Sequence, residues 1–331
     1  MLPNLPKNPL ENISNPPENI PNPMLSLEKG LSPLMKFQQA FIESCFTPDR
    51  LPPGAQDPFA ETRESMRKPP NGTNPVVLVH GTWANRYNTW KTLAPELKNA
   101  GFSVSALNYG EKGNLPKVCK GYTDIRESAK ELAKFVDEVL QKTGASKVDM
   151  IGHSQGGGIL PRWYLKYEGG KEKVDKLIGL APSNHGLTAT GLGTLANMIA
   201  TLLRIQALAN EAVILSAGIA CLQQSLESTE NLNPKLDDGG DTFGGVKYIA
   251  LSTWRDEVVT PWQNGHLKGA DGHTFTNLTL QEYQGFKYDL TEHNGMPNHP
   301  VSIEVVKRAL VGKPVDPQNL IVQRPPFMLT P

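Results

Sequence analysis

The stretch Val148–Leu160 reads VDMIGHSQGGGIL and decides the expected fold. Within it, Gly152-His153-Ser154-Gln155-Gly156 matches the pattern G-x-S-x-G. The pentapeptide alone is a weak signal, but the apolar run before it predicts a strand and Gly157–Tyr167 predicts a helix after it. A strand, a sharp turn and a helix are the setting of a nucleophilic serine, and glycines beside that serine avoid clashes in the turn. We therefore predict Ser154 as a nucleophile; the alternative is a glycine-rich loop around a structural serine.

Strands and helices are expected to alternate on both sides of this stretch. Short apolar runs predict strands, and apolar residues at helical spacing predict helices. The expected strands are Val76–His80, Phe102–Leu107, Val148–Gly152, Val174–Ala181 and Val246–Ser252, and the expected helices are Trp90–Ala100, Ile125–Gln141, Gly157–Tyr167 and Val301–Leu310. Such alternation implies parallel pairing of the strands. We predict the α/β class, with a mostly parallel, doubly wound sheet, helices on both faces, and a site at the carboxyl ends of the strands.

The rest of the chain divides into an arm, an insertion and a tail. Residues 1–70 are rich in proline and carry a helical patch near Ser32–Cys45, and we expect this arm to pack on the core. Residues 71–331 form the expected catalytic domain, which includes a helical, cap-like insertion at 186–245 and a proline-rich tail at 312–331.

The insertion begins with Gly186–Leu203, a run of 18 residues without a charged side chain. That length is near the lower limit for a membrane span. Asn197 and three glycines interrupt the run, and no basic flank follows the positive-inside pattern, so we predict no transmembrane segment. Two interpretations stay open: buried or partly buried helices that cap the sheet, and a mobile apolar cap that meets lipid.

Composition excludes several other classes of protein. The chain has 331 residues, with 33 Lys and Arg against 33 Asp and Glu, so its net charge is zero and it lacks the basic field that binds nucleic acid. Cys45, Cys119 and Cys221 are too few for a disulfide scaffold and lack the spacing of metal ligands. Either Cys45 pairs with Cys119 or all three are buried thiols. No secretory signal is visible, because residues 1–23 lack the necessary apolar core.

A nucleophilic serine needs a base, and histidine commonly serves. In α/β hydrolases the chain order is serine, acid, histidine, so the base should lie just before the last helix. His293 and His299 both meet this condition. His299 lies against Pro300 at the start of the helix, where a capping or surface role is natural, whereas His293 lies in a loop with Gly295. We predict His293 as the base and keep His299 as the alternative.

The acid that orients the histidine should follow a strand. Asp256 comes shortly after the strand Val246–Ser252, and we predict it as the acid. The adjacent Glu257 is expected to point away. The other aspartates considered are Asp237, Asp238 and Asp241 in a glycine-rich turn before the strand, and Asp271 and Asp289, expected at the surface.

An oxyanion hole needs one N–H from the residue after the nucleophile and one from the loop after the first core strand. Those residues are Gln155 and Thr82, and the Thr82 hydroxyl is a further donor. Gly81 lets this loop turn close to the site. We expect the substrate to contact five neighbouring residues, namely His80, Gly81, Trp83, His153 and Leu187.

Taken in order, these motifs resemble the secreted class 2 bacterial triacylglycerol lipases of the actinomycete type. The matching stretches, which cover roughly residues 74–311, are Val76–Thr82, Leu93–Leu97, Ala106–Gly110, Gly152–Gly156, Leu180–Gly186, Asp256–Pro261 and Glu292–Gly295. The chain is more remotely similar to fungal lipase B, in Ser-Gln-Gly at the turn, Asp-Glu-x-Val near the acid, and an acidic residue followed by His-x-Gly at the base. The resemblance implies the α/β-hydrolase fold, a Ser154–Asp256–His293 triad, and Thr82 and Gln155 as oxyanion donors.

The chain departs from these relatives at several points. They often carry a cysteine on the second core strand, paired with one upstream, where this chain has Ser103, so that bridge is absent. Fungal lipase B has a tryptophan at the position of His153, which leaves the alcohol-side pocket in doubt. Residues 1–35 have no matching segment in the family.

The resemblance implies hydrolysis of carboxylic esters, without a metal or an organic cofactor, by a secreted monomer. A lipase that cleaves acylglycerols or similar apolar esters, at a lipid–water interface, is the main expectation. A short-chain carboxylesterase, a polyester hydrolase and an acyltransferase would use the same triad and stay open as alternatives. A binding protein without turnover is a further reading, since a fold alone does not establish activity.

Overall fold

The computed structural model describes residues 72–112, 120–188, 190–191 and 219–322. The expected proline-rich arm, its helical patch at Ser32–Cys45, and both Cys45 and Cys119 lie outside the described residues. The domain boundaries and the Cys45–Cys119 pairing therefore stay predictions. Cys221 is described, and it is a buried free thiol.

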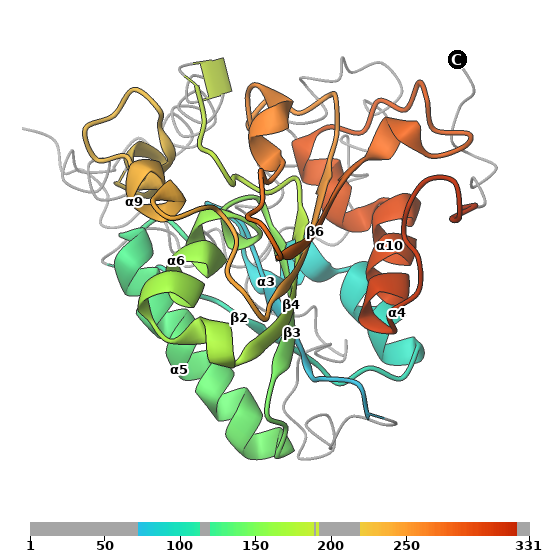
Figure 1. Cartoon of the computed structure of the whole chain (residues 1–331), viewed down its shortest axis with the longest axis horizontal. Helices are drawn as coiled ribbons and strands as arrows, with labels where there is room; N and C mark the ends of the chain where they lie inside the picture. Colours follow the sequence, from blue (N-terminus) through green and yellow to red (C-terminus); the bar gives the residue numbers. More distant parts are fainter. Residues whose placement is uncertain (1–71, 113–119, 189, 192–218, 323–331) are drawn as a thin grey trace, which may run out of the picture.

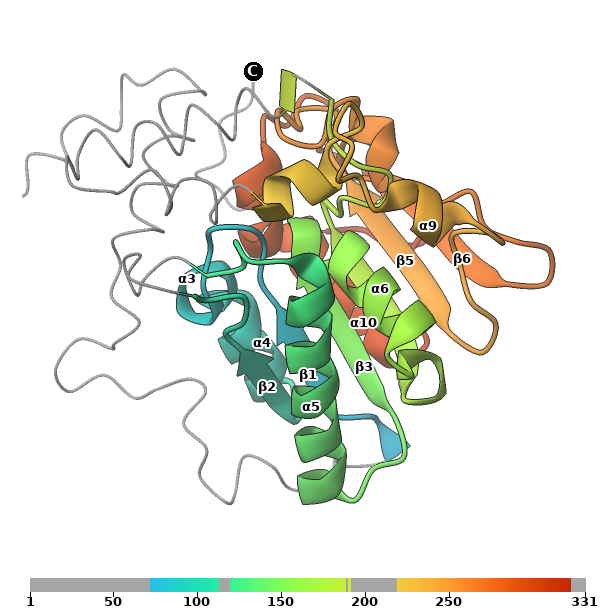
Figure 2. The ribbon, with the colours of Figure 1, turned by 90° about the vertical axis from the view of Figure 1, so that its left-hand side faces the viewer.

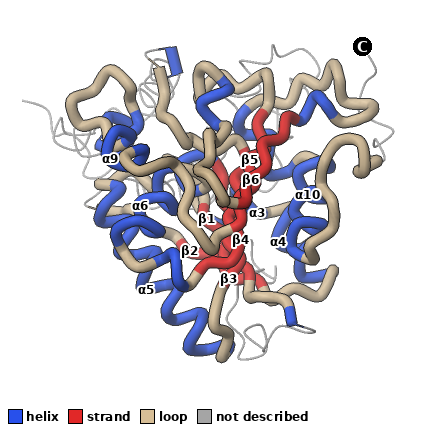
Figure 3. The backbone as a smooth tube through the Cα atoms, viewed as in Figure 1, coloured by secondary structure: helices blue, strands red, loops and turns tan. Residues whose placement is uncertain are grey.

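The centre of the molecule is a six-stranded, all-parallel sheet in the order β2-β1-β3-β4-β5-β6. Its strands are β1 Val76–Val79, β2 Val104–Leu107, β3 Val148–His153, β4 Val174–Leu180, β5 Lys247–Ser252 and β6 Thr274–Thr279. Every residue of β1 and β3 is buried, which explains why these strands read as apolar runs without alternation. Figure 3 shows the sheet passing between two groups of helices.

Helices cover both faces of the sheet, as predicted (Figures 1 and 2). The α-helices are α3 Arg86–Trp90, α4 Leu93–Asn99, α5 Ile125–Thr143, α6 Ile159–Tyr167, α9 Asn233–Asp237 and α10 Pro300–Leu310, and the 3-10 helices are Ser154–Gly156, Gly170–Glu172, Trp262–Gly265, Leu280–Glu282 and His293–Asn298. On one face, Leu78 and Ile151 pack with apolar residues of α4 and α10. On the other face, Val77 and Met150 pack with apolar residues of α5 and α6.

Most expected elements are confirmed to within a few residues, and α5 shows why. Asp124 caps its first turn by accepting a hydrogen bond from the Arg126 backbone N–H. Gly144 ends the helix in the left-handed region, with φ 67°.

One expected helix is wrong in detail, and one strand was not expected. The single helix expected at Trp90–Ala100 is two helices, and the first begins earlier, at the Asn85 cap. A continuous helix is disfavoured because Pro95 has no N–H to donate to the Lys91 carbonyl oxygen, and its ring crowds that oxygen. Strand β6 was not predicted: its sequence TFTNLT is half threonine and lacks the apolar run that marks the other strands, and its first two residues are exposed.

The insertion between β4 and β5 is described only in part. Its described residues include α9 and a helical stretch at 219–224. The Leu187 N–H donates to the Gln224 carbonyl (2.8 Å), and the Leu226 N–H donates to the Leu187 carbonyl (2.9 Å), so these bonds join the start of the insertion to residues 224–226. Within the described part of the chain, no helix has the length and apolar character to cross a membrane.

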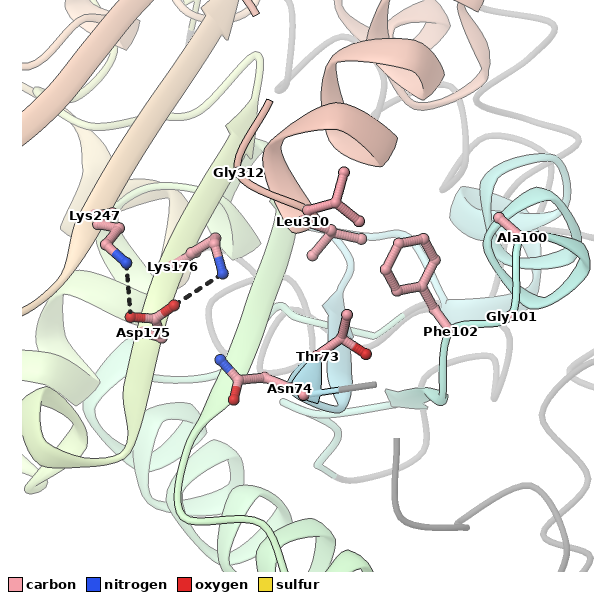
Figure 4. A pocket seen from close by; sticks show the side chains of 12 residues that line it. Thr73, Asn74, Ala100, Gly101, Phe102, Asp175, Lys176, Lys247, Leu310 and Gly312 are labelled. Atoms are coloured by element: carbon pink, nitrogen blue, oxygen red, sulfur yellow. Dashed lines mark hydrogen bonds and ion pairs between the residues drawn. The ribbon is translucent and has the colours of Figure 1, made fainter. Parts of the chain in front are cut away.

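A cavity of about 550 Å³ lies at the amino ends of the strands (Figure 4). Asp175, Lys176 and Lys247 line one side of it, and Phe102 and Leu310 line the other. Lys176 pairs with Asp175 (2.8 Å) and Lys247 pairs with Asp175 (3.3 Å). The cavity is at the opposite end of the sheet from Ser154, so the predicted site does not use it.

The packing of α5 on the sheet predicts a stability difference between its two sides. Leu132 is completely buried in the core, so Leu132→Ala should lower the free energy of unfolding by about 2–5 kcal/mol. Glu138→Ala, on the exposed side of the same helix, should change it by less than about 0.5 kcal/mol. Urea unfolding followed by circular dichroism measures both, and equal effects would contradict the observed burial.

Candidate active site

The turn after β3 holds Ser154 in an unusual backbone conformation. Ser154 has φ 55°, in the left-handed region that side chains other than glycine rarely adopt. A Cβ on Gly152 would lie 1.8 Å from the Gly156 carbonyl oxygen, so the chain can fold back on itself only with glycine there. The predicted sharp turn is therefore present at Ser154.

The loop after β1 passes directly beside this turn. A Cβ on Gly81 would lie 2.9 Å from the Cβ of Ser154, and a Cβ on Gly156 would lie 2.2 Å from the His80 carbonyl oxygen. The two loops thus meet through their backbones, as expected for adjacent parallel strands. Thr82 and Gln155, predicted from separate loops, are in direct contact: the Thr82 hydroxyl donates to Gln155 Oε1 (3.0 Å).

Asp256 and His293 form a buried pair. His293 Nδ1 lies 2.9 Å from Asp256 Oδ2, and both side chains are less than 5% exposed. The other carboxylate oxygen, Oδ1, accepts hydrogen bonds from the backbone N–H groups of Val258 (3.0 Å) and Val259 (2.7 Å). These bonds fix the carboxylate, so Asp256 can orient the imidazole and stabilise its charged form.

The alternative acids and base lie elsewhere. Asp237 and Asp241 contact His185, and Asp238 and Asp271 are exposed. Asp289 is buried, not at the surface as expected, and it lies 3.4 Å from His299 Nε2. His299 caps α10, because its Nδ1 accepts from the Val301 N–H (3.2 Å).

Two contacts hold the loop that carries His293. His153 Nε2 donates to the His293 carbonyl oxygen (3.0 Å), and the two rings lie 4.8 Å apart. The Thr253 hydroxyl donates to the Thr291 carbonyl oxygen (2.7 Å), which ties the loop to the end of β5. Since His153 directly precedes Ser154 in the chain, its hydrogen bond to the His293 carbonyl oxygen places the loop of His293 beside the turn that carries Ser154.

Glu257 differs from its expected orientation. Its Oε2 accepts a hydrogen bond from the His293 backbone N–H (3.3 Å) instead of pointing away. Burial raises the pKa of Glu257 to about 7, against the lowering effect of His293. A second carboxyl group therefore lies beside the Asp256–His293 pair.

The ionisation of the two histidines is set by opposite influences. Burial disfavours the imidazolium form of His293, but the charge and hydrogen bond of Asp256 outweigh it and raise the pKa of His293. Burial and the nearby His293 hold the pKa of His153 well below its ordinary value. His153 thus stays neutral while His293 can take up a proton.

The remaining predicted substrate contacts are mostly enclosed. His80 is fully buried and stacks on Tyr109, with ring centroids 4.4 Å apart. Trp83 is 2% exposed and stacks on Tyr122 at 5.5 Å. Leu187 is 1% exposed and lies at the root of the insertion. Their contact with substrate stays a prediction.

Sequence reasoning missed a second cluster of acids around a histidine. His185 Nδ1 lies 3.1 Å from Asp237 Oδ2, and its Nε2 lies 3.0 Å from Asp241 Oδ2. Burial opposes the charged imidazole, but the two carboxylates raise the pKa of His185. The buried Arg162 also bonds Asp237 (2.6 Å), and these pairs join the end of β4 to α9.

The described residues include no group of three or more His, Cys, Asp or Glu side chains arranged to hold a metal ion.

Sequence reasoning also missed Gln224, which contacts Thr82 and Gln155 from the insertion. No pattern in the sequence marks this glutamine, since its partners are 142 and 69 residues away.

Comparison with known proteins gives a family and a set of partial relatives. A family model described as alpha/beta hydrolase fold matches residues 74–289. A triacylglycerol lipase from Burkholderia plantarii is 33% identical over 109 residues, which are 31% of this chain and 25% of the relative. A triacylglycerol lipase from Pseudarthrobacter phenanthrenivorans is 35% identical over 89 residues, which are 25% of each chain. The matches thus span a quarter of the length of these relatives.

Solved structures share the fold. Lipase B from Aspergillus fumigatus superposes with a TM-score of 0.58 at 22% identity, over 76% of this chain and 56% of that one. The mature form of a lipase from Bacillus licheniformis gives 0.50 at 17% identity, over 77% of this chain and 96% of that one.

The contact between Asp256 and His293 predicts how the imidazole titrates. In the native protein, His293 should titrate above its ordinary pKa of 6.5, because protonation gains the attraction of the Asp256 carboxylate. Asp256→Asn removes that charge, and Glu257→Gln removes a smaller contribution, so both should lower the pKa of His293. NMR of selectively ¹⁵N-labelled histidine measures it.

His185 serves as an internal control in the same spectra. Its partners are Asp237 and Asp241, so its titration should not move in either variant. An unchanged His293 titration in Asp256→Asn would show that this carboxylate does not set its pKa.

Proposed function

Because the chain belongs to the alpha/beta hydrolase family, we propose that it is a serine carboxylic-ester hydrolase, foremost a lipase that cleaves apolar esters. The observation that carries the proposal is the buried Asp256–His293 pair next to the strained turn that bears Ser154. Strain of this kind concentrates at functional sites, and here it presents a hydroxyl group at the carboxyl end of a central strand.

In the first half of the reaction, Ser154 Oγ attacks the ester carbonyl carbon and His293 Nε2 accepts the hydroxyl proton. Asp256 holds the ring through Nδ1 and stabilises the imidazolium that forms. The carbonyl oxygen becomes an oxyanion, which the N–H groups of Thr82 and Gln155 stabilise. The C–O bond to the alcohol then breaks, and the alcohol leaves with the proton from His293.

In the second half, water takes the place of the alcohol. His293 accepts a proton from water as the oxygen attacks the acyl-enzyme carbonyl. The second oxyanion collapses, the bond to Ser154 Oγ breaks, and His293 returns its proton to the serine. The products are an acid and an alcohol, and the enzyme is regenerated.

Several features support an apolar acyl group as the substrate. Leu222 and Leu226, on the insertion beside Leu187, are 43% and 42% exposed, although large apolar residues are usually buried. The uncharged run Gly186–Leu203 belongs to the same insertion. The curated relatives bear the name triacylglycerol lipase, and we propose the same activity here.

The surroundings of the enzyme are part of the proposal. We propose that it acts outside the cell, as a monomer at a lipid–water interface. The basis is the resemblance of its sequence motifs to those of secreted lipases.

The proposal predicts serine-dependent hydrolysis of p-nitrophenyl esters. Ser154→Ala should lower kcat by a factor on the order of 10⁴–10⁶, because the nucleophile is lost. Ser146→Ala, on an exposed turn after α5, is the matched control and should retain full activity. Thermal unfolding of both variants checks that they are folded.

The acyl chain length decides among the candidates. Hydrolysis of esters from acetate to palmitate, with long chains included, is the result expected of a lipase. Activity on short esters alone would replace the lipase proposal with a carboxylesterase, and transfer to an added alcohol in preference to water would indicate an acyltransferase. Absence of any serine-dependent hydrolysis would overturn the proposal.

A further inference from the structure

Gln224 reaches from the insertion to both residues of the predicted oxyanion hole. Its side chain is 1% exposed, and its Nε2 lies 3.0 Å from Gln155 Oε1 and 3.2 Å from Thr82 Oγ1. The same nitrogen donates to the Ala220 carbonyl oxygen (3.0 Å). An amide nitrogen has two protons, so one serves Ala220 and the other is shared between Gln155 and Thr82.

The orientation of this amide is fixed from the other side. The Ser183 hydroxyl donates to Gln224 Oε1 (2.8 Å), which leaves Nε2 directed at Gln155 and Thr82. The backbone of Gln224 is held as well, because its carbonyl oxygen accepts from the Leu187 N–H (2.8 Å). Both anchors lie in the segment that follows β4.

The Thr82 hydroxyl has a single proton, and in this structure it goes to Gln155 Oε1. To donate to an oxyanion, the hydroxyl must turn away from Gln155. Gln155 is completely buried, and a buried acceptor without a donor is unfavourable. Because Gln224 Nε2 also donates to Gln155 Oε1, that oxygen keeps a donor when Thr82 turns.

We propose that Gln224 is a positioning residue that releases the Thr82 hydroxyl to serve as a third donor to the oxyanion. When the Thr82 hydroxyl turns away, the Gln224 side-chain N–H remains as the donor to Gln155 Oε1. This inference rests on the proposed ester hydrolysis. It also means that the donor strength of the oxyanion hole depends on a residue of the insertion. Removal of one such donor typically costs about 10²–10³ in kcat, so a misdirected hydroxyl should be measurable.

The test is a double-mutant cycle between Gln224→Met and Thr82→Val, read in kcat and KM for p-nitrophenyl butyrate. Methionine has a similar length but cannot donate, and valine keeps the branched shape of threonine and its backbone N–H. We expect Gln224→Met alone to lower kcat by about 10–100-fold with KM within about twofold. In the Thr82→Val background the same substitution should cost less than about threefold, because the hydroxyl it acts on is gone.

Gln223 provides the matched control. It is the adjacent, fully buried glutamine, and its Oε1 accepts from the Ile125 N–H at the start of α5 (2.8 Å), away from Thr82. Gln223→Met should lower the melting temperature and leave kcat within about twofold. Gln224→Leu removes the donor without adding a charge, and it replaces Gln224→Met if that variant does not fold.

The outcomes separate the two proposals. Suppose that the native enzyme hydrolyses the ester and that the effects of Gln224→Met and Thr82→Val on kcat simply multiply. Gln224 is then a packing residue, and the inference about it is overturned while the proposed function stands. An equal loss of kcat in Gln223→Met overturns it as well. If the native enzyme shows no hydrolysis, the proposed function fails and takes this inference with it.

Discussion

Close backbone contact around Ser154 is the constraint on which the rest of the site depends. Gly152, Gly156 and Gly81 stand where any Cβ would overlap a neighbouring atom, so two loops from adjacent strands touch through their main chains. That contact sets Ser154 at φ 55° and puts Thr82 against Gln155. Parallel strands deliver all these loops to the same edge of the sheet, which is why residues far apart in sequence meet there.

Burial then gives neighbouring groups different chemical roles. Asp256 has both oxygens occupied, by two backbone N–H groups and by His293, and so acts on the imidazole in a fixed direction. His153 has the same side chain as His293 and lies beside it, yet burial without a carboxylate keeps it neutral. The environment, not the residue type, thus decides which histidine can carry a proton.

The sequence was most informative where a residue is constrained by its own neighbours in the chain. The glycines around Ser154, the run in β3 and the apolar spacing in α5 are local signals, and the structure has these elements where they were expected. Strand β6 was missed because its short, threonine-rich sequence is stabilised by pairing with β5. Gln224 and the His185 cluster were missed because their partners come from distant segments, and the orientation of Glu257 was wrong because it depends on the His293 backbone.

The contacts of His185 with Asp237 and Asp241 hold the insertion to the end of β4, and their contribution to stability depends on proton uptake by the imidazole. An imidazole can donate from both nitrogens only as a cation, so the folded state binds a proton that the unfolded chain gives up more easily. The pKa of His185 is raised on folding, so its contribution is complete below the ordinary pKa and disappears as pH rises through the folded value. The pKa of Asp241 is lowered to about 2, despite burial, by His185 and two backbone N–H groups, so its contribution is lost only in strong acid. A rise in pH through the folded pKa of His185 should therefore loosen the attachment of the insertion while leaving the core of the sheet, whose contacts are apolar, intact.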